Sequence, residues 1–150
     1  MSTTNTNRVV QPYLFFEGRC EEALEFYRKK LGAEVTMMFR FKDSPDPTMA
    51  CPGVSPEKVM HASFRIGETT MLASDGRCES KAEFKGFALS ITAAKEGEAD
   101  RLFAGVMDGG TAVMPLSKTF FSPRFGMAID RFGVCWMIIV PQPMDAPKPH

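Results

Sequence analysis

The sequence has little histidine and no excess of charge of either sign. Only two of the 150 residues are histidines, one of them the last residue, and 18 Lys and Arg balance 18 Asp and Glu. Two imidazoles are too few for the usual histidine-based metal cage. A neutral chain without a basic tract also lacks the charge that neutralises nucleic-acid phosphates. The composition therefore predicts neither a histidine metal centre nor a nucleic-acid partner.

Long apolar runs are missing as well. No stretch approaches the ~20 apolar residues that a membrane-spanning helix needs. Residues 1–8 are polar, unlike the apolar core of a secretion signal. The four cysteines form no CxxC pair and lie far apart, at Cys20, Cys51, Cys78 and Cys135. We therefore expect a soluble, cytoplasmic protein without a membrane partner, whose cysteines are free thiols rather than a disulfide framework.

What the sequence does contain is an alternation of short apolar segments that occurs twice. Strands are expected where Val, Ile, Phe and Met cluster between turn residues, and helices where apolar residues recur at helical spacing. A long loop is expected over residues 42–58, which hold four prolines. The predicted strands are 9–16, 33–41, 59–66, 69–74, 84–92, 111–116, 125–130 and 134–140, and the predicted helices are 19–31 and 95–107.

The element order, one strand, one helix and three strands, therefore repeats. Leu24 and Leu102 lie 78 positions apart in the two predicted helices, and Gly32 and Gly110 have the same spacing. A unit of this size does not bury its sheet alone, whereas two paired units do. We predict two βαβββ modules that together form one domain over residues 8–142. The modules are expected at 8–78 and 84–142, with loose tails at 1–7 and 143–150.

Several segments occur in an order that is shared with a known superfamily. They are PYLFF at 12–16, CEEALEFY at 20–27 with Leu31-Gly32, His61-Ala62, MLASD at 71–75, Pro115-Leu116, TFF at 119–121, Phe125-Gly126 and DRFGVCWM at 130–137. With these segments the chain resembles the vicinal oxygen chelate superfamily of glyoxalases, bleomycin-resistance proteins and dioxygenases. Within it the chain is most similar to the PhnB-like group, which is often labelled 3-demethylubiquinone-9 3-methyltransferase. The group often has Trp where this chain has Phe121. The resemblance implies an α+β fold of cupped, mainly antiparallel sheets, and a homodimer.

The superfamily is named for a metal held by His, Gln or Glu side chains. Carried over to this chain, its ligand positions fall at Gln11 or Pro12, Met71, Gly86 and Met137. Only the glutamine suits a hard or borderline cation, because glycine has no side chain and a thioether is a soft ligand. We predict no cofactor and no metal ligands. A divalent metal remains an alternative, although the usual positions are not filled.

The resemblance also implies that a small, largely apolar ligand binds inside the cup. His61 is the candidate catalytic residue, because an imidazole with a pKa near ~6.5 suits a general base or a hydrogen bond to substrate. The alternative is a half-buried strand histidine that bonds a backbone carbonyl. For Phe121 the alternative is core packing, and for the strand methionines it is gap filling. The predicted pocket residues are Gln11, Tyr13, His61, Met71, Phe121 and Met137.

Other polar residues have simpler readings. Ser74-Asp75 ends a predicted strand, where it either presents an acceptor at the mouth of the cup or forms an Asx turn. Glu21-Glu22 are expected to be a solvated pair at a helix start. Cys135, in an apolar strand, is expected to be inert.

The resemblance implies three functional classes. The first is a PhnB-like protein of unknown substrate that binds a small molecule without the usual metal. The second is a metal-dependent enzyme of the glyoxalase or dioxygenase type. The third is a resistance protein that sequesters a drug. The methyltransferase label finds no support in an adenosyl-cofactor motif, because Gly109-Gly110 is predicted to end a helix and not to open one.

Overall fold

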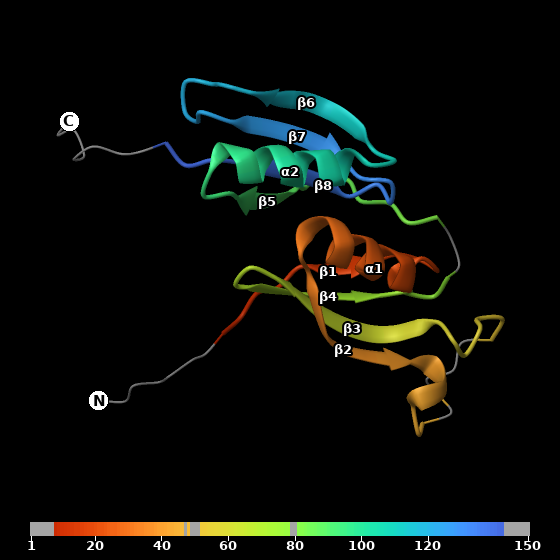
Figure 1. Ribbon diagram of the computed structural model, residues 1–150. Helices are drawn as coiled ribbons and strands as arrows, with labels where there is room; N and C mark the ends of the chain where they lie inside the picture. Colours follow the sequence, from red (N-terminus) through yellow and green to blue (C-terminus); the bar gives the residue numbers. More distant parts are fainter. Residues whose placement is uncertain (1–7, 47, 49–51, 79–80, 143–150) are drawn as a thin grey trace, which may run out of the picture. The chain divides into compact units, whose positions relative to one another are not determined.

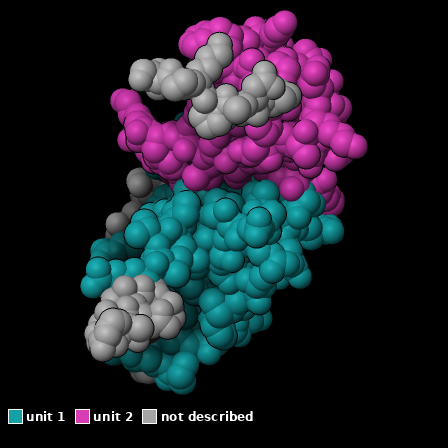
Figure 2. Space-filling view, turned by 90° about the vertical axis from the view of Figure 1, so that its left-hand side faces the viewer, with its two compact units in different colours: residues 1–28, 32–81 teal, residues 29–31, 82–150 magenta. Residues whose placement is uncertain are grey.

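The computed structural model of this chain describes residues 8–46, 48, 52–78 and 81–142 (Figure 1). The chain divides into two compact units, residues 1–28 with 32–81 and residues 29–31 with 82–150, which are coloured separately in Figure 2. The predicted tails, 1–7 and 143–150, lie outside the described residues, as do Cys51 and part of the predicted proline-rich loop.

The predicted order of one strand, one helix and three strands, repeated once, is confirmed, and the fold is α+β. The first unit contains β1 (Tyr13–Phe15), α1 (Cys20–Leu31) except for its last three residues, β2 (Glu34–Arg40), the short 3₁₀ turn η1 (Phe41–Asp43), β3 (Val59–Ile66) and β4 (Thr69–Ser74). The second contains β5 (Leu89–Thr92), α2 (Glu96–Met107), β6 (Thr111–Ser117), β7 (Phe125–Ile129) and β8 (Cys135–Ile139).

Each unit holds one four-stranded sheet, with the strand orders β1-β4-β3-β2 and β5-β8-β7-β6. The first strand of each unit pairs in parallel with the last, and the other pairs are antiparallel. The sheets are therefore mainly antiparallel, as predicted. In Figure 1, α1 lies against one face of the first sheet, and α2 against one face of the second.

The core of the first unit lies between α1 and its sheet. Leu14, Leu24 and Tyr27 are buried, and the ring of Tyr27 stacks on that of Phe64 at 6.0 Å between centroids. In the second unit, Val106 of α2, together with Trp136 and Ile138 of β8, is buried in the same way. Because one helix covers one face only, the other face of each sheet is left without a helix of its own unit.

Two strand predictions were too long at their N-terminal ends. β1 begins at Tyr13 and not at residue 9, because Pro12 has no N–H to donate and only its carbonyl joins the sheet, accepting from the Leu72 N–H at 2.9 Å. β5 begins at Leu89 and not at residue 84. Gly86, with φ of +83°, takes a left-handed conformation that a strand does not accommodate.

Three further expectations concern cysteines, glycines and membranes. Cys20, Cys78 and Cys135 form no disulfide with one another. Gly109-Gly110 follows the end of α2, as predicted. In the part of the chain that the structure describes, no helix has the length and apolar character to cross a membrane.

Candidate functional site

The open face of the first sheet, the face away from α1, is defined by strand register. In β1, Leu14 is buried under the helix, so its neighbours Tyr13 and Phe15 point to the open face. In the next strands, His61 pairs directly with Phe39. Directly paired residues point to the same face. The aromatic rings of two strands therefore gather on one side of the sheet around His61.

The hydroxyl of Tyr13 and Nδ1 of His61 are 3.0 Å apart and form a hydrogen bond. Their ring centroids are 5.6 Å apart, and Tyr13 stacks on Phe15 at 4.8 Å with 29° between the ring planes. The alternative partner for this histidine was a backbone carbonyl, and the partner is instead a phenol 48 positions away. The structure thus brings together two of the predicted pocket residues, Tyr13 and His61.

Gln11 and Met71 lie in the same unit but take no part in this pair. The Gln11 side-chain amide donates to the carbonyl of Thr70 at 3.1 Å, which ties the start of β1 to β4. Met71 is only 4% exposed and pairs with Phe64, the residue that stacks under α1. The sulfur of Met71 is therefore on the helix-covered face, opposite to Tyr13. We leave Met71 out of the open face because its place in the β4 alternation is a core position.

Met137 and Phe121 lie in the second unit. Met137 pairs directly with Met127, and Met127 with Met114, so three methionines form a row across β8, β7 and β6. Its neighbours Trp136 and Ile138 are buried, which places this row on the open face of the second sheet. The ring of Phe121 meets those of Phe120 and Phe125 edge-on, each at 5.1 Å. Phe121 is 42% exposed, so it is only partly used in packing.

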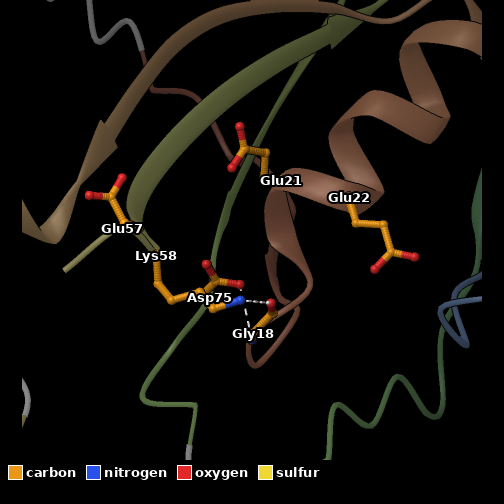
Figure 3. A pocket seen from close by; sticks show the side chains of 6 residues that line it. All are labelled: Gly18, Glu21, Glu22, Glu57, Lys58 and Asp75. Atoms are coloured by element: carbon orange, nitrogen blue, oxygen red, sulfur yellow. Dashed lines mark hydrogen bonds between the residues drawn. The ribbon is translucent and has the colours of Figure 1, made fainter. Parts of the chain in front are cut away.

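A polar pocket of about 290 Å³ lies at the start of α1 (Figure 3). It is lined by Gly18, Glu21, Glu22, Glu57, Lys58 and Asp75. Asp75 is 1% exposed; its Oδ1 accepts the N–H groups of Gly18 and Cys20 at 2.9 and 2.7 Å, and its Oδ2 accepts that of Val59 at 2.7 Å.

Asp75 therefore acts as a helix cap supplied from a distant strand. The residue before α1, Arg19, makes no side-chain capping bond. The carboxylate bonds the first N–H of the helix instead, where the positive end of the helix dipole favours an anion. Neither sequence reading of Asp75, as a site acceptor or as an Asx turn, anticipated this role. The only available signal was a helix that begins without a capping residue.

The other charged side chains of this pocket form hydrogen bonds or ion pairs with neighbouring residues. Lys58 Nζ donates to the Gly18 carbonyl at 2.8 Å and Glu57 pairs with Lys42 at 3.1 Å. Glu21 pairs with Arg40 at 2.7 Å, and the side-chain hydrogen bond from Arg40 lowers the pKa of that carboxyl. The predicted solvated pair, Glu21-Glu22, is exposed as expected. We assign this pocket a structural role.

The thiols do not suit nucleophilic chemistry. Burial, followed by the nearby Asp75 carboxylate, raises the pKa of Cys20 far above its usual range. Burial also raises the pKa of Cys135, with Asp130 as the second cause. A raised pKa keeps a thiol protonated and unreactive.

The residues at the superfamily's metal-ligand positions do not fit a metal ion. The amide of Gln11 is used on Thr70, Met71 is on the covered face, and Gly86 precedes β5 without a side chain. Within the described ranges, no group of three or more His, Cys, Asp or Glu side chains is placed to hold a metal. No chemical step is therefore derived through a metal.

Comparisons with known proteins agree with this architecture. The chain is 33% identical to Protein YjdN of Escherichia coli (strain K12) over 138 residues, covering 87% of this chain and 94% of that protein. The solved structure of protein PA1353 from Pseudomonas aeruginosa is 37% identical, with a TM-score of 0.80, and 91% and 100% of the two chains are covered.

Two further solved structures share the fold. A putative 3-demethylubiquinone-9 3-methyltransferase, PhnB protein, from Bacillus cereus is 27% identical, with a TM-score of 0.74 and coverage of 89% and 99%. The fosfomycin resistance protein FosX from Listeria monocytogenes is 12% identical, with a TM-score of 0.61 and coverage of 91% and 94%; at that identity it shows the fold alone. The family model for 3-demethylubiquinone-9 3-methyltransferase matches residues 8–139. The chain therefore belongs to this PhnB-like family and has the glyoxalase/bleomycin-resistance fold.

Proposed function

We propose that this protein binds a small, largely apolar molecule against the open face of the first sheet. One observation supports this most directly: exposed aromatic rings surround a single hydrogen-bonded imidazole. Tyr13, Phe15 and Phe39 are 37%, 52% and 45% exposed, and His61 lies between them. Ligand sites combine apolar and aromatic walls with a few placed polar groups, and exposed apolar patches mark binding surfaces.

The charges near this face favour a neutral ligand. Arg65 lies on the same face of β3 as His61, four residues further along the strand. It forms an ion pair with Glu34, the residue directly opposite on β2. The charge of Arg65 on this face is therefore paired. A small molecule that stacks on Tyr13 and Phe15 would lose water from apolar carbon on both sides, which is the main favourable contribution to such binding.

The proposal includes no methyl-transfer step, although the family name refers to one. An adenosyl cofactor of the usual kind needs a glycine-rich turn that opens a helix. The glycine pair at Gly109-Gly110 follows α2 instead. The proposed activity is ligand binding at the Tyr13–His61 face. If the ligand is turned over, His61 is the residue that would act as the general base.

The test uses naphthalene as a probe and nuclear magnetic resonance titration of the labelled protein as readout. Phe39→Ser removes an open-face ring, and we expect it to weaken naphthalene binding about tenfold. Phe87→Ser is the matched control, because Phe87 is also 45% exposed but belongs to the second unit. No binding to the wild type, or equal weakening by both substitutions, would contradict the proposal.

We also propose, from the resemblance to the superfamily, that the protein forms a homodimer in the cytoplasm. Val113 and Met114 of β6 are 54% and 43% exposed, which supports a further apolar contact surface on the second unit. Light scattering after size-exclusion chromatography tests the oligomeric state, and a monomer at every concentration would contradict it. Cell fractionation tests the compartment.

A further inference from the structure

We infer that the Tyr13–His61 pair selects planar aromatic ligands that carry a hydrogen-bond acceptor, such as a ring nitrogen or a carbonyl. This inference rests on the proposed function, because it concerns the same open face. Beyond the proposed function, the inference names the class of ligand and the atom that recognises this ligand, Nε2 of His61.

The first step concerns the direction of the hydrogen bond. A phenol O–H is a stronger donor than a neutral imidazole N–H, and an imidazole nitrogen is a stronger acceptor than a phenol oxygen. Tyr13 therefore donates to Nδ1 of His61 across the 3.0 Å contact. A neutral imidazole whose Nδ1 accepts has its proton on Nε2.

The second step concerns the free end of the imidazole. The contact to Tyr13 is the hydrogen bond that His61 makes within the described part of the chain, and it uses Nδ1. Because His61 is only partly buried, the Nε2–H group is left for a molecule on the open face. That group donates, so its partner must accept.

The third step concerns shape. The rings of Tyr13 and Phe15 stack at 4.8 Å with 29° between their planes, and Phe39 lies on the other side of His61 on the neighbouring strand. Flat exposed rings pair best with another flat ring, in offset or edge-on contact. Because Arg65 and Glu34 on this face pair with one another, the ligand that satisfies both features is a neutral aromatic with an acceptor on its edge.

The experiment compares isoquinoline with naphthalene, two bicyclic probes of the same shape that differ by one ring nitrogen. At pH 7.5, the wild type is expected to bind isoquinoline about fivefold more tightly, the factor that one net hydrogen bond supplies. His61→Leu should remove this preference, so that the ratio of the two dissociation constants falls to about one whatever the variant does to naphthalene binding itself. His61→Gln, which restores an N–H donor, should recover part of it.

Tyr13 is a positioning residue, and its test needs a readout that loss of packing would not change. Tyr13→Phe keeps the ring and removes only the hydroxyl, so we expect naphthalene binding to persist and the isoquinoline preference to fall. Nitrogen-15 spectra of the imidazole distinguish a protonated from a bare nitrogen. They should show a bare, hydrogen-bonded Nδ1 in the wild type, and loss of that hydrogen-bond shift in Tyr13→Phe.

The outcomes separate this inference from the proposed function. Equal binding of both probes, with resonance shifts at Tyr13 and Phe39, would overturn the inference and leave the apolar site standing. A proton on Nδ1 would also overturn it. Failure of both probes to bind would overturn the proposed function and the inference with it.

Discussion

The two sheets have the same strand order, yet each unit uses its buried carboxylate differently. In the first unit Asp75 bonds backbone N–H groups 16, 55 and 57 positions away. In the second, Asp130 bonds the N–H groups of Phe132 and Val134 and the indole of Trp136, all within six positions. Both carboxylates satisfy three donors, but one joins distant elements and the other fixes a single hairpin.

The position that corresponds to Asp75 in the second unit shows the same contrast. Asp75 N–H donates to the carbonyl of Val59 at 2.9 Å, and Val140 N–H donates to that of Arg124 at 3.0 Å. The side chain of Val140 has no acceptor that could cap α2. The Val140 carbonyl instead accepts a hydrogen bond from the Ser122 hydroxyl at 2.6 Å. The two units therefore share the backbone hydrogen bond that follows the last strand, whereas the side chains at this position, Asp75 and Val140, differ.

The largest expected effect breaks the long-range cap. Asp75→Ala leaves the buried N–H groups of Cys20 and Val59 without an acceptor, together with that of Gly18. We expect a loss of about 4 kcal/mol in the free energy of unfolding, measured by urea denaturation. Amide exchange should accelerate at Cys20 and Val59 together. Fast exchange at only one of them would contradict a cap that joins the two elements.

A smaller effect is expected from the local carboxylate. Asp130→Asn turns an amide N–H₂ towards Trp136 Nε1, now 2.9 Å from a carboxylate oxygen. We expect a loss of about 2 kcal/mol. Adding Trp136→Phe removes the opposing donor, so the double variant should be no less stable than Trp136→Phe alone. If the two losses simply add, the indole is not the partner that matters.

Two glycines should respond with opposite signs. Gly32 ends α1 at φ of +69°, a conformation that costs a side chain strain, so Gly32→Ala should destabilise by about 1 kcal/mol. Gly97 is exposed in α2 with open space around it, so Gly97→Ala should stabilise by about 0.5 kcal/mol through helix propensity. Thermal unfolding of the two variants tests this, and a shift of the same sign in both would contradict it.

The smallest effect concerns the exposed ion pairs. The hydrogen bond from Arg40 lowers the pKa of Glu21, so its contribution to stability is complete above the ordinary carboxyl pKa and is lost as the pH falls through the lowered value. The stability difference between wild type and Glu21→Gln should therefore be small at pH 7 and shrink further as the pH falls below the ordinary carboxyl pKa. In the second unit, Asp100→Asn breaks the partly exposed ion pair with Arg124, whose atoms are 2.9 Å apart. Its loss of stability at pH 7 should be similarly small, because exposed ion pairs contribute little.

The strands and helices could be predicted because their signals are local. β3 and β4 have the predicted bounds, 59–66 and 69–74, since period-two patterns between turn residues need no tertiary information. The N-terminal ends of β1 and β5 could not be predicted from such local patterns. Apolar residues before Tyr13 and Leu89 have strand propensity, but no neighbouring strand pairs with them in full.

The candidate site was only partly predictable. Tyr13 and His61 could be named from the sequence, but not their contact, because it joins residues 48 positions apart through strand register. Met71 was named from the family's ligand position, and only strand register shows that it lies opposite Phe64 on the helix-covered face.

The sequence by itself determined the repeated βαβββ order and the residues of the apolar sheets, because periodicity and turn chemistry act over a few neighbouring residues. The family followed from the resemblance of its motif segments. Only the tertiary structure decided which face each side chain occupies, that Asp75 caps α1, and that Tyr13 and His61 form a hydrogen bond. Those features depend on strand pairing between segments far apart in the chain, and the register of that pairing is set by the packing of the whole unit.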